Sequence, residues 1–263
     1  PGSACLDEKT AACLGRFTDA GGKLIVIGAG AMDRNGETLL IDIGAKYVGK
    51  ANYDRDYLLA GPELLTDLIE SPFLNFKPAR RFKPDLGTEI LAHLHEPYFS
   101  RTLEHYCSHQ NAPHRLETSE CPAIIRKGNI IFIAPELDWM YLKHGARLHR
   151  DLFINVLKLV HKRPMIEAQL PSAGRLTFIH QARENRYVAH LLYAPPMQRG
   201  NCEIIEDMPP LYEATLRFDL PETILCATLI PEKLDLTITQ EGSKASVTIP
   251  KFSCHCAVAL TYE

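Results

Sequence analysis

The feature that most constrains the fold is a continuous apolar run near the start of the chain, at residues 23–29. This run is rich in β-branched residues and does not alternate with polar ones, which predicts a strand buried on both faces, as in a parallel sheet. A helix is predicted just before it, at residues 8–20, with Asp7 as N-cap and the Gly21-Gly22 pair as its stop. A helix followed by a buried strand is typical of an α/β fold.

A doubly wound α/β domain normally opens with a strand, whereas this chain opens with a helix and without an initiator Met. We therefore expect the sequence to begin inside such a domain, with its earlier units upstream. Further along, the patterns predict a strand at residues 88–95 and a hairpin with strands at 123–126 and 129–134. A helix is predicted at residues 148–160, before Pro164.

The pattern changes after Pro164, where helical periodicity gives way to short alternating segments separated by turn residues. These segments are residues 175–180, 187–193, 212–220, 234–239, 245–249 and 256–262. Regularly spaced short strands of this kind indicate an all-β sandwich. The predicted organisation is therefore an incomplete α/β domain with a parallel sheet at residues 1–163, followed by a β-sandwich domain at residues 164–263.

Composition and charge exclude several classes of partner. A net charge of −3 gives no electrostatic reason to expect nucleic acid or an anionic membrane as partner. The apolar runs are far shorter than the ~20 residues needed to cross a bilayer, so no membrane partner is expected. The eight cysteines are scattered through a chain large enough to fold without disulfides. They are interpreted as reduced, buried thiols, which favours a cytoplasmic location.

A glycine-rich turn directly follows the first buried strand, with Gly28 and Gly30 spaced as in a dinucleotide-binding turn. The third glycine position holds Asp33, whose charge would repel a phosphate, and residues 34–36 have turn chemistry instead of opening a helix. A structural turn is therefore favoured, and no cofactor is expected. A nucleotide-dependent enzyme is kept as a hypothesis that depends on this turn alone.

A histidine-rich segment begins at the end of the strand predicted at residues 88–95 and continues to His114. Its possible metal ligands are His93, His95, His105, Cys107, His109 and His114. His105, Cys107 and His109 match no ordinary zinc spacing, and the sequence has no CxxC pair, so no metal site is predicted. Two interpretations remain: a polar loop packed by its own aromatic side chains, or a loop that contacts a neighbouring domain or subunit.

If this segment borders an active site, its candidate residues are Glu96, Tyr98, Arg101, His105 and His109. Arg101 and His105 are then the main polar contributors, because ionisable groups gathered beside aromatic residues are typical of functional sites. Elsewhere the sequence offers no nucleophile in a G-x-S-x-G elbow. The acidic residues Glu203, Glu206 and Asp207 are interpreted as a solvated strand face. No catalytic residue is predicted.

Several stretches resemble known glycoside hydrolases. Residues 17–26, Phe-Thr-Asp-Ala-Gly-Gly-Lys-Leu-Ile-Val, are similar to the helix-to-strand passage of the β-galactosidase trimerisation domain of family 42 enzymes. A second resemblance is to a group of α-amylase- or β-galactosidase-like glycosyl hydrolases. It is carried by residues 96–99, 105–110, 122–125, 149–152, 185–193 and 204–212. Together these stretches cover nearly the whole chain.

The resemblance implies a flavodoxin-like, glutamine-amidotransferase-like fold for residues 1–163. It also implies that the catalytic (β/α)₈ barrel, which needs ~200 residues or more, lies upstream, so no catalytic residue is carried over. The chain would then be an accessory and oligomerisation region of a glycoside hydrolase, assembling as a homo-oligomer, a trimer by this resemblance. Its carbohydrate substrate would bind through the missing domain. The alternative is a stand-alone carbohydrate-binding module, with Tyr98, Phe99, Tyr106 and Trp139 available to stack on sugar rings.

Overall fold

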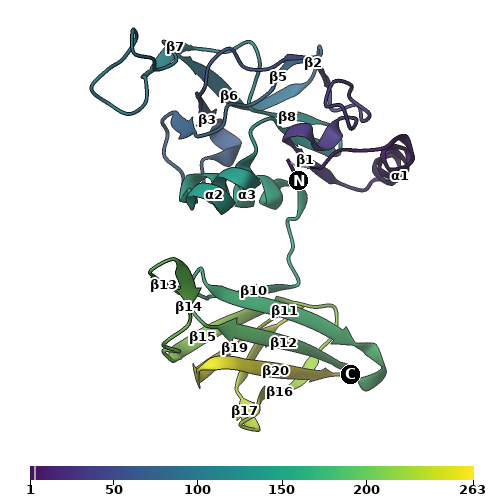
Figure 1. Ribbon diagram of the computed structural model, residues 1–263. Helices are drawn as coiled ribbons and strands as arrows, with labels where there is room; N and C mark the ends of the chain where they lie inside the picture. The colour runs from purple at the N-terminus through teal and green to yellow at the C-terminus, as the bar shows by residue number, and fades with distance from the viewer. Residues whose placement is uncertain (3) are drawn as a thin grey trace. The chain divides into compact units, whose positions relative to one another are not determined.

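The computed structural model describes residues 1–2 and 4–263, and the chain divides into two compact units, Pro1–Lys162 and Arg163–Glu263 (Figure 1). The molecule is mostly β, with 42% of its residues in strands and 17% in helices. The elements of the first unit are α1 (Glu8–Asp19), β1 (Leu24–Ile27), η1 (Gly28–Ala31), β2 (Ala45–Gly49), β3 (Asp56–Ala60), η2 (Pro62–Leu64), β4 (Phe73–Asn75), β5 (Arg81–Pro84), β6 (Glu89–Pro97), β7 (His114–Thr118), β8 (Ile124–Lys127), β9 (Ile130–Ile133), α2 (Leu137–His144) and α3 (Arg147–Val160).

The first unit is built on one mixed sheet. Its strands follow the order β1-β9-β8-β6-β3-β4, with β7 pairing β6, while β2 and β5 form a separate ribbon. Among the described residues only β1 and β9 pair in parallel, with Leu24 opposite Ile130 and Ile27 opposite Ile133. The other pairings of this sheet, from β8–β9 to β3–β4, are antiparallel.

The predicted flavodoxin-like fold is therefore wrong. A flavodoxin-like domain has a parallel sheet with helices on both faces. Here the sheet is antiparallel at every described pairing but one, and helices α2 and α3 lie together on one side of it (Figure 1). The trimer expected from that resemblance stays a prediction.

Local features of the first unit do follow the sequence patterns. Helix α1 begins after Asp7, whose carboxylate accepts a hydrogen bond from the Thr10 amide at 2.7 Å. Helix α3 packs its apolar face, including Leu152 and Val156, into the core. The hairpin β8–β9 turns at Gly128, which has a φ of +54° that only glycine adopts without strain. These three predictions are confirmed, and α2 was missed.

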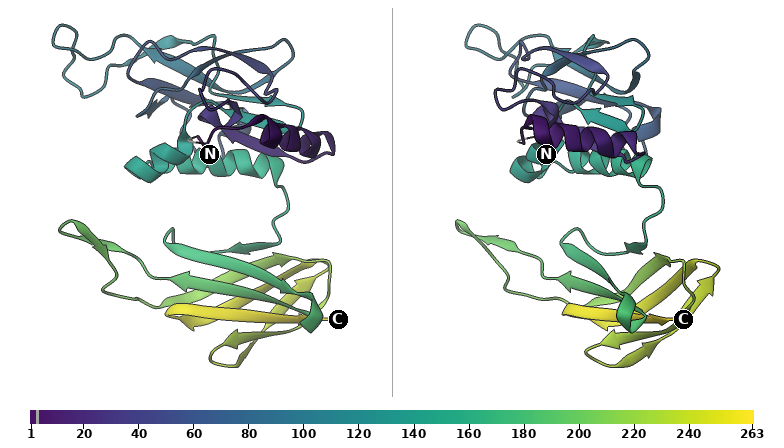
Figure 2. Two further views of the ribbon diagram at one scale, coloured as in Figure 1. Left: turned by 45° about the vertical axis from the view of Figure 1, so that its right-hand side comes forward. Right: turned by 90° about the vertical axis from the view of Figure 1, so that its right-hand side faces the viewer.

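The second unit contains two antiparallel sheets, β10-β15-β19-β18 and β11-β12-β20-β16-β17, and the separate hairpin β13–β14. Its elements are β10 (Ile166–Ala168), β11 (Gly174–Gln181), η3 (Ala182–Glu184), β12 (Arg186–Tyr193), β13 (Met197–Arg199), β14 (Cys202–Ile204), β15 (Leu211–Asp219), β16 (Ile224–Ile230), β17 (Leu234–Leu236), β18 (Ile238–Glu241), β19 (Lys244–Phe252) and β20 (Cys254–Tyr262). Side chains from both sheets, such as Leu216 and Val258, form one buried cluster. The hairpin β13–β14 extends away from these sheets (Figure 2).

The glycine-rich turn after β1 is a structural turn. Residues Gly28–Ala31 form a single turn of 3₁₀ helix, η1, and the chain after it does not continue as an α-helix. A Cβ atom at Gly28 would lie 2.8 Å from Glu136 Cγ, and one at Gly30 would lie 3.0 Å from the Pro1 carbonyl oxygen. Both glycines are therefore required by close packing against other parts of the same unit.

All eight cysteines are free thiols, but only Cys256 is buried. The expected burial is wrong for Cys5, Cys13, Cys202 and Cys226, which are exposed. In the part of the chain that the structure describes, no helix is long and apolar enough to span a membrane.

Candidate functional site

The candidate site is the β6–β7 loop, residues 98–113, which projects from the end of the sheet in the first unit (Figure 1). Every residue from 98 to 111 is exposed or half-buried. Its base is closed by a backbone hydrogen bond from the Tyr98 amide to the Pro113 carbonyl at 3.0 Å. The Tyr57 hydroxyl adds a hydrogen bond to the Ala112 carbonyl. A long, exposed loop held at both ends by strands is a typical place for binding residues.

Large apolar side chains of the loop lie in solvent. The exposed fractions are 98% for Leu103, 71% for Tyr106 and 51% for Tyr98. Single exposed apolar residues are normal on protein surfaces, but three on one projecting loop indicate a surface that contacts another molecule or domain.

The five residues predicted from the sequence fall into two groups. Arg101, His105 and His109 lie on the exposed part of the loop, while Glu96 and Tyr98 lie at its base. The Arg101 guanidinium donates to the Gln110 carbonyl at 3.3 Å, across the loop. The His105 amide donates to the Thr102 hydroxyl at 3.0 Å, and the His105 ring centroid lies 6.4 Å from that of Phe99. No hydrogen bond joins the Arg101 and His105 side chains within the described chain.

Glu96 belongs to a buried ion-pair network that the sequence analysis missed. Its carboxylate accepts two hydrogen bonds from the Arg81 guanidinium, from Nε and from Nη2, each at 2.9 Å. Arg81 Nη1 donates at 2.9 Å to Asp56, whose side chain is fully buried. Asp56 also accepts from Asn75 Nδ2 at 2.7 Å and from the Ala79 amide at 2.8 Å. With these donors around it the Asp56 carboxylate has a complete set of partners.

The network continues into helix α3 through His149. The His149 Nε2 atom lies 3.1 Å from Oδ1 of the Asn75 side-chain amide. Because the Nδ2 group of that amide donates to Asp56, its Oδ1 atom is the acceptor, and the His149 ring donates to it. Burial, with a smaller effect of His144, lowers the pKa of His149 to about 4. His149 is therefore neutral at pH 7.

The electrostatics of the ion pairs follow from burial and partners. Burial raises the pKa of Asp56, and Arg81 acts against that shift. Burial acts to lower the pKa of Arg81, but hydrogen bonds and charges of Glu96 and Asp56 outweigh it and raise the pKa. The Glu96 carboxylate is thus held in a two-hydrogen-bond ion pair with Arg81. It anchors the end of β6, where the loop begins, and is not free to act as a general base.

The histidines near the base of the loop contact the backbone and one another. His95 Nδ1 donates to the Arg115 carbonyl at 3.0 Å, and its ring lies against His114, with centroids 5.5 Å apart. Burial and the neighbouring His95 lower the pKa of His93. Among the described residues, no three His, Cys, Asp or Glu side chains gather as a metal site.

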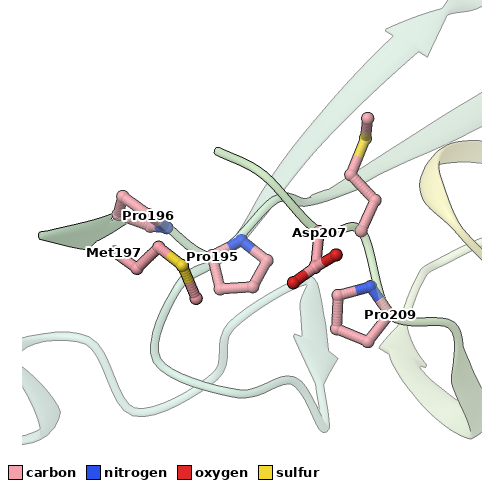
Figure 3. Close-up of a pocket in the computed structure, with 6 residues that line it drawn as sticks. Pro195, Pro196, Met197, Asp207 and Pro209 are labelled. Atoms are coloured by element: carbon pink, nitrogen blue, oxygen red, sulfur yellow. The ribbon is translucent and has the colours of Figure 1, made fainter. Parts of the chain in front are cut away.

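The acidic residues 203–207 lie on the β13–β14 hairpin and on the segment after it. Glu206 accepts a hydrogen bond from Arg199 at 2.8 Å, and both side chains are exposed. A hollow of about 590 Å³ lies at the root of this hairpin, with the Asp207 carboxylate beside prolines (Figure 3). It is lined by Pro195, Pro196, Met197, Asp207, Met208 and Pro209. With one titratable group it has no carboxylate pair for glycosidic hydrolysis.

The fold of this chain is similar to that of one part of a glycoside hydrolase. A solved structure, that of α-L-fucosidase isoenzyme 2 from Paenibacillus thiaminolyticus, matches with a TM-score of 0.91 and 27% sequence identity. The match covers 100% of this chain and 40% of the fucosidase chain, so the present sequence spans less than half of that enzyme. No family model and no curated protein matches the chain. The predicted relation to a part of a glycoside hydrolase is confirmed at this level.

Proposed function

We propose that this chain is an accessory region of a glycoside hydrolase that acts on α-L-fucosides. The observation that supports the proposal is the match of the entire chain to part of an α-L-fucosidase. In the proposed protein a separate catalytic domain carries the acid and nucleophile carboxylates, and this region presents the β6–β7 loop to it. Arg101 and His105 on that loop then contribute polar contacts at the border of the active site.

The first expected result concerns the isolated chain. The purified 263-residue chain should not hydrolyse 4-nitrophenyl α-L-fucoside, because its described units contain mixed and antiparallel sheets and no barrel of eight parallel strands. A protein carrying this region together with a catalytic domain should release 4-nitrophenol. Turnover by the isolated chain would refute the accessory role. Activity of the longer protein on the β-D-galactoside instead of the fucoside would favour a β-galactosidase-like enzyme.

The second expected result concerns the loop. In the longer protein, Arg101→Ala and His105→Ala should each lower kcat/KM by roughly 10–100-fold, because displaced contacts misalign the substrate. Both side chains are exposed, so the melting temperature should not change. Arg217→Ala, at an exposed position of β15 in the second unit, is the matched control and should leave kinetics unchanged. Equal kinetics for the loop variants and the control would contradict the proposal that the loop borders the active site.

A further inference from the structure

A second candidate site lies on the outer face of the sheet β10-β15-β19-β18 in the second unit. An open groove of about 740 Å³ runs over this face, within the size range of small-molecule sites. It is lined by Gln169, Leu170, Pro171, Leu211, Tyr212, Glu213, Ala214, Thr215 and Thr248.

The groove is shaped by an irregularity in β15. The register with β19 is unbroken here, with Tyr212 opposite Lys251 and Ala214 opposite Ile249, but the backbone of β15 is distorted at Glu213. Glu213 has a φ of +54°, which is strained for a residue other than glycine. Tyr212 and Glu213 are both exposed and both line the groove, although neighbouring residues of a regular strand point to opposite faces. The irregularity therefore brings an aromatic ring and a carboxylate to the same face.

Tyr212 is presented for contact. Its side chain is 64% exposed, and the Lys251 ammonium lies 5.6 Å from its ring centroid, which holds the ring by a cation–π contact. An exposed Tyr that is fixed in place offers a flat apolar face with a polar hydroxyl at its edge.

The remaining lining residues supply hydrogen-bonding groups. Thr215 and Thr248 lie side by side on neighbouring strands, with their hydroxyl oxygens 3.5 Å apart. Each hydroxyl both donates and accepts, the Gln169 amide does the same, and the Glu213 carboxylate accepts. One carboxylate in the groove and one ammonium beside it leave no net charge to select an ionic ligand. A ligand with many hydroxyls, no charge and one apolar face fits this combination.

We propose that this groove binds a neutral saccharide, with Tyr212 stacked on the sugar ring and with Thr215, Thr248, Gln169 and Glu213 bonding its hydroxyls. The inference goes beyond the accessory role proposed above, because it gives the second unit a binding activity of its own. It requires neither a catalytic domain nor the β6–β7 loop.

The test is binding of the purified full chain to an array of neutral and acidic glycans, followed by titration calorimetry with the best neutral glycan. Tyr212→Ala should weaken binding about tenfold or more, while Tyr212→Phe, which keeps the ring, should change it far less. Thr248→Arg, which extends a long side chain into the groove, should also remove binding. Tyr141→Ala is the matched control, because Tyr141 is another exposed tyrosine with a guanidinium 5.9 Å from its ring centroid.

Binding to no neutral glycan on the array would overturn the inference, as would equal affinity of the unchanged chain and Tyr212→Ala. Circular dichroism of each variant checks that the second unit is folded. These outcomes are separate from the proposed enzymatic role, because an inactive longer protein would refute that role and leave the binding data unchanged.

Discussion

Replacing Arg81 with Met is expected to lower the free energy of unfolding of the first unit by about 3–5 kcal/mol. Met fills much of the volume of the arginine side chain but leaves the Asp56 carboxylate buried without its cation. Asp56 is 0% exposed, and Arg81 links it to Glu96 by hydrogen bonds of 2.9 Å. Removing one partner of a buried ion pair costs far more than the pair contributes in net stability, because the remaining charge loses its solvation without compensation.

The measurement is urea unfolding followed by tryptophan fluorescence. The chain has a single tryptophan, Trp139 in α2, so the signal reports on the first unit alone. The matched control is Arg126→Met, which breaks the solvent-exposed ion pairs with Glu89 and Glu63 and should cost less than about 1 kcal/mol. Equal destabilisation by the two substitutions would show that the buried network has no special role.

Acidification should destabilise the first unit through His149. The folded-state pKa is about 4, below the ordinary value of 6.5, so the unfolded chain takes up a proton at a higher pH than the folded chain does. The stability that this histidine contributes is fully present above pH 6.5 and is lost as the pH falls toward 4. The loss is about 3 kcal/mol, because each unit of pKa difference corresponds to about 1.4 kcal/mol.

The test compares the pH dependence of urea unfolding between pH 7 and 4 in the unchanged chain and in His149→Gln. Gln keeps a donor for the Asn75 carbonyl and has no proton to gain in this range, so the variant should lose less stability on acidification by about 3 kcal/mol. Carboxylates titrate in both proteins and cancel in the difference. His161→Gln, at the exposed C-cap of α3, should keep the full dependence. Identical pH curves for His149→Gln and the unchanged chain would contradict the buried neutral histidine.

The sequence predicted those elements that local chemistry specifies. Helix α1 depends on the Asp7 cap, and the hairpin β8–β9 on a glycine in the turn. By contrast, α2 was missed because its apolar and polar residues show little helical periodicity and no side chain caps its start. Strand β16 was missed as well, because a register shift between Ile224 and Cys226 interrupts its alternation.

The fold class was mispredicted because one buried strand does not determine the directions of its neighbours. β1 is parallel to β9, as its continuous apolar run indicated, but β8 pairs with β9 as an antiparallel hairpin, and β6, β3 and β4 continue the sheet in antiparallel pairs. Their pairing depends on long-range contacts such as Leu58 opposite Leu94. The buried ion-pair network of Asp56, Arg81 and Glu96 likewise depends on contacts between residues far apart in the sequence. Asp56 and Arg81 are 25 positions apart in the sequence. The one local sign of this ion pair was the charged residue Asp56 at the start of an apolar strand.

The closure of the β6–β7 loop at Tyr98 and Pro113 separates two kinds of evolutionary constraint. Beyond that backbone hydrogen bond, residues 99–111 contribute no buried side chain among the residues described, so the core of the unit places little demand on their identity. The fold then tolerates changes in the length or composition of the tip. Selection on these residues acts only through the molecule or domain that the loop contacts. Such a loop can adapt quickly to a new partner surface while the sheet that carries it stays the same.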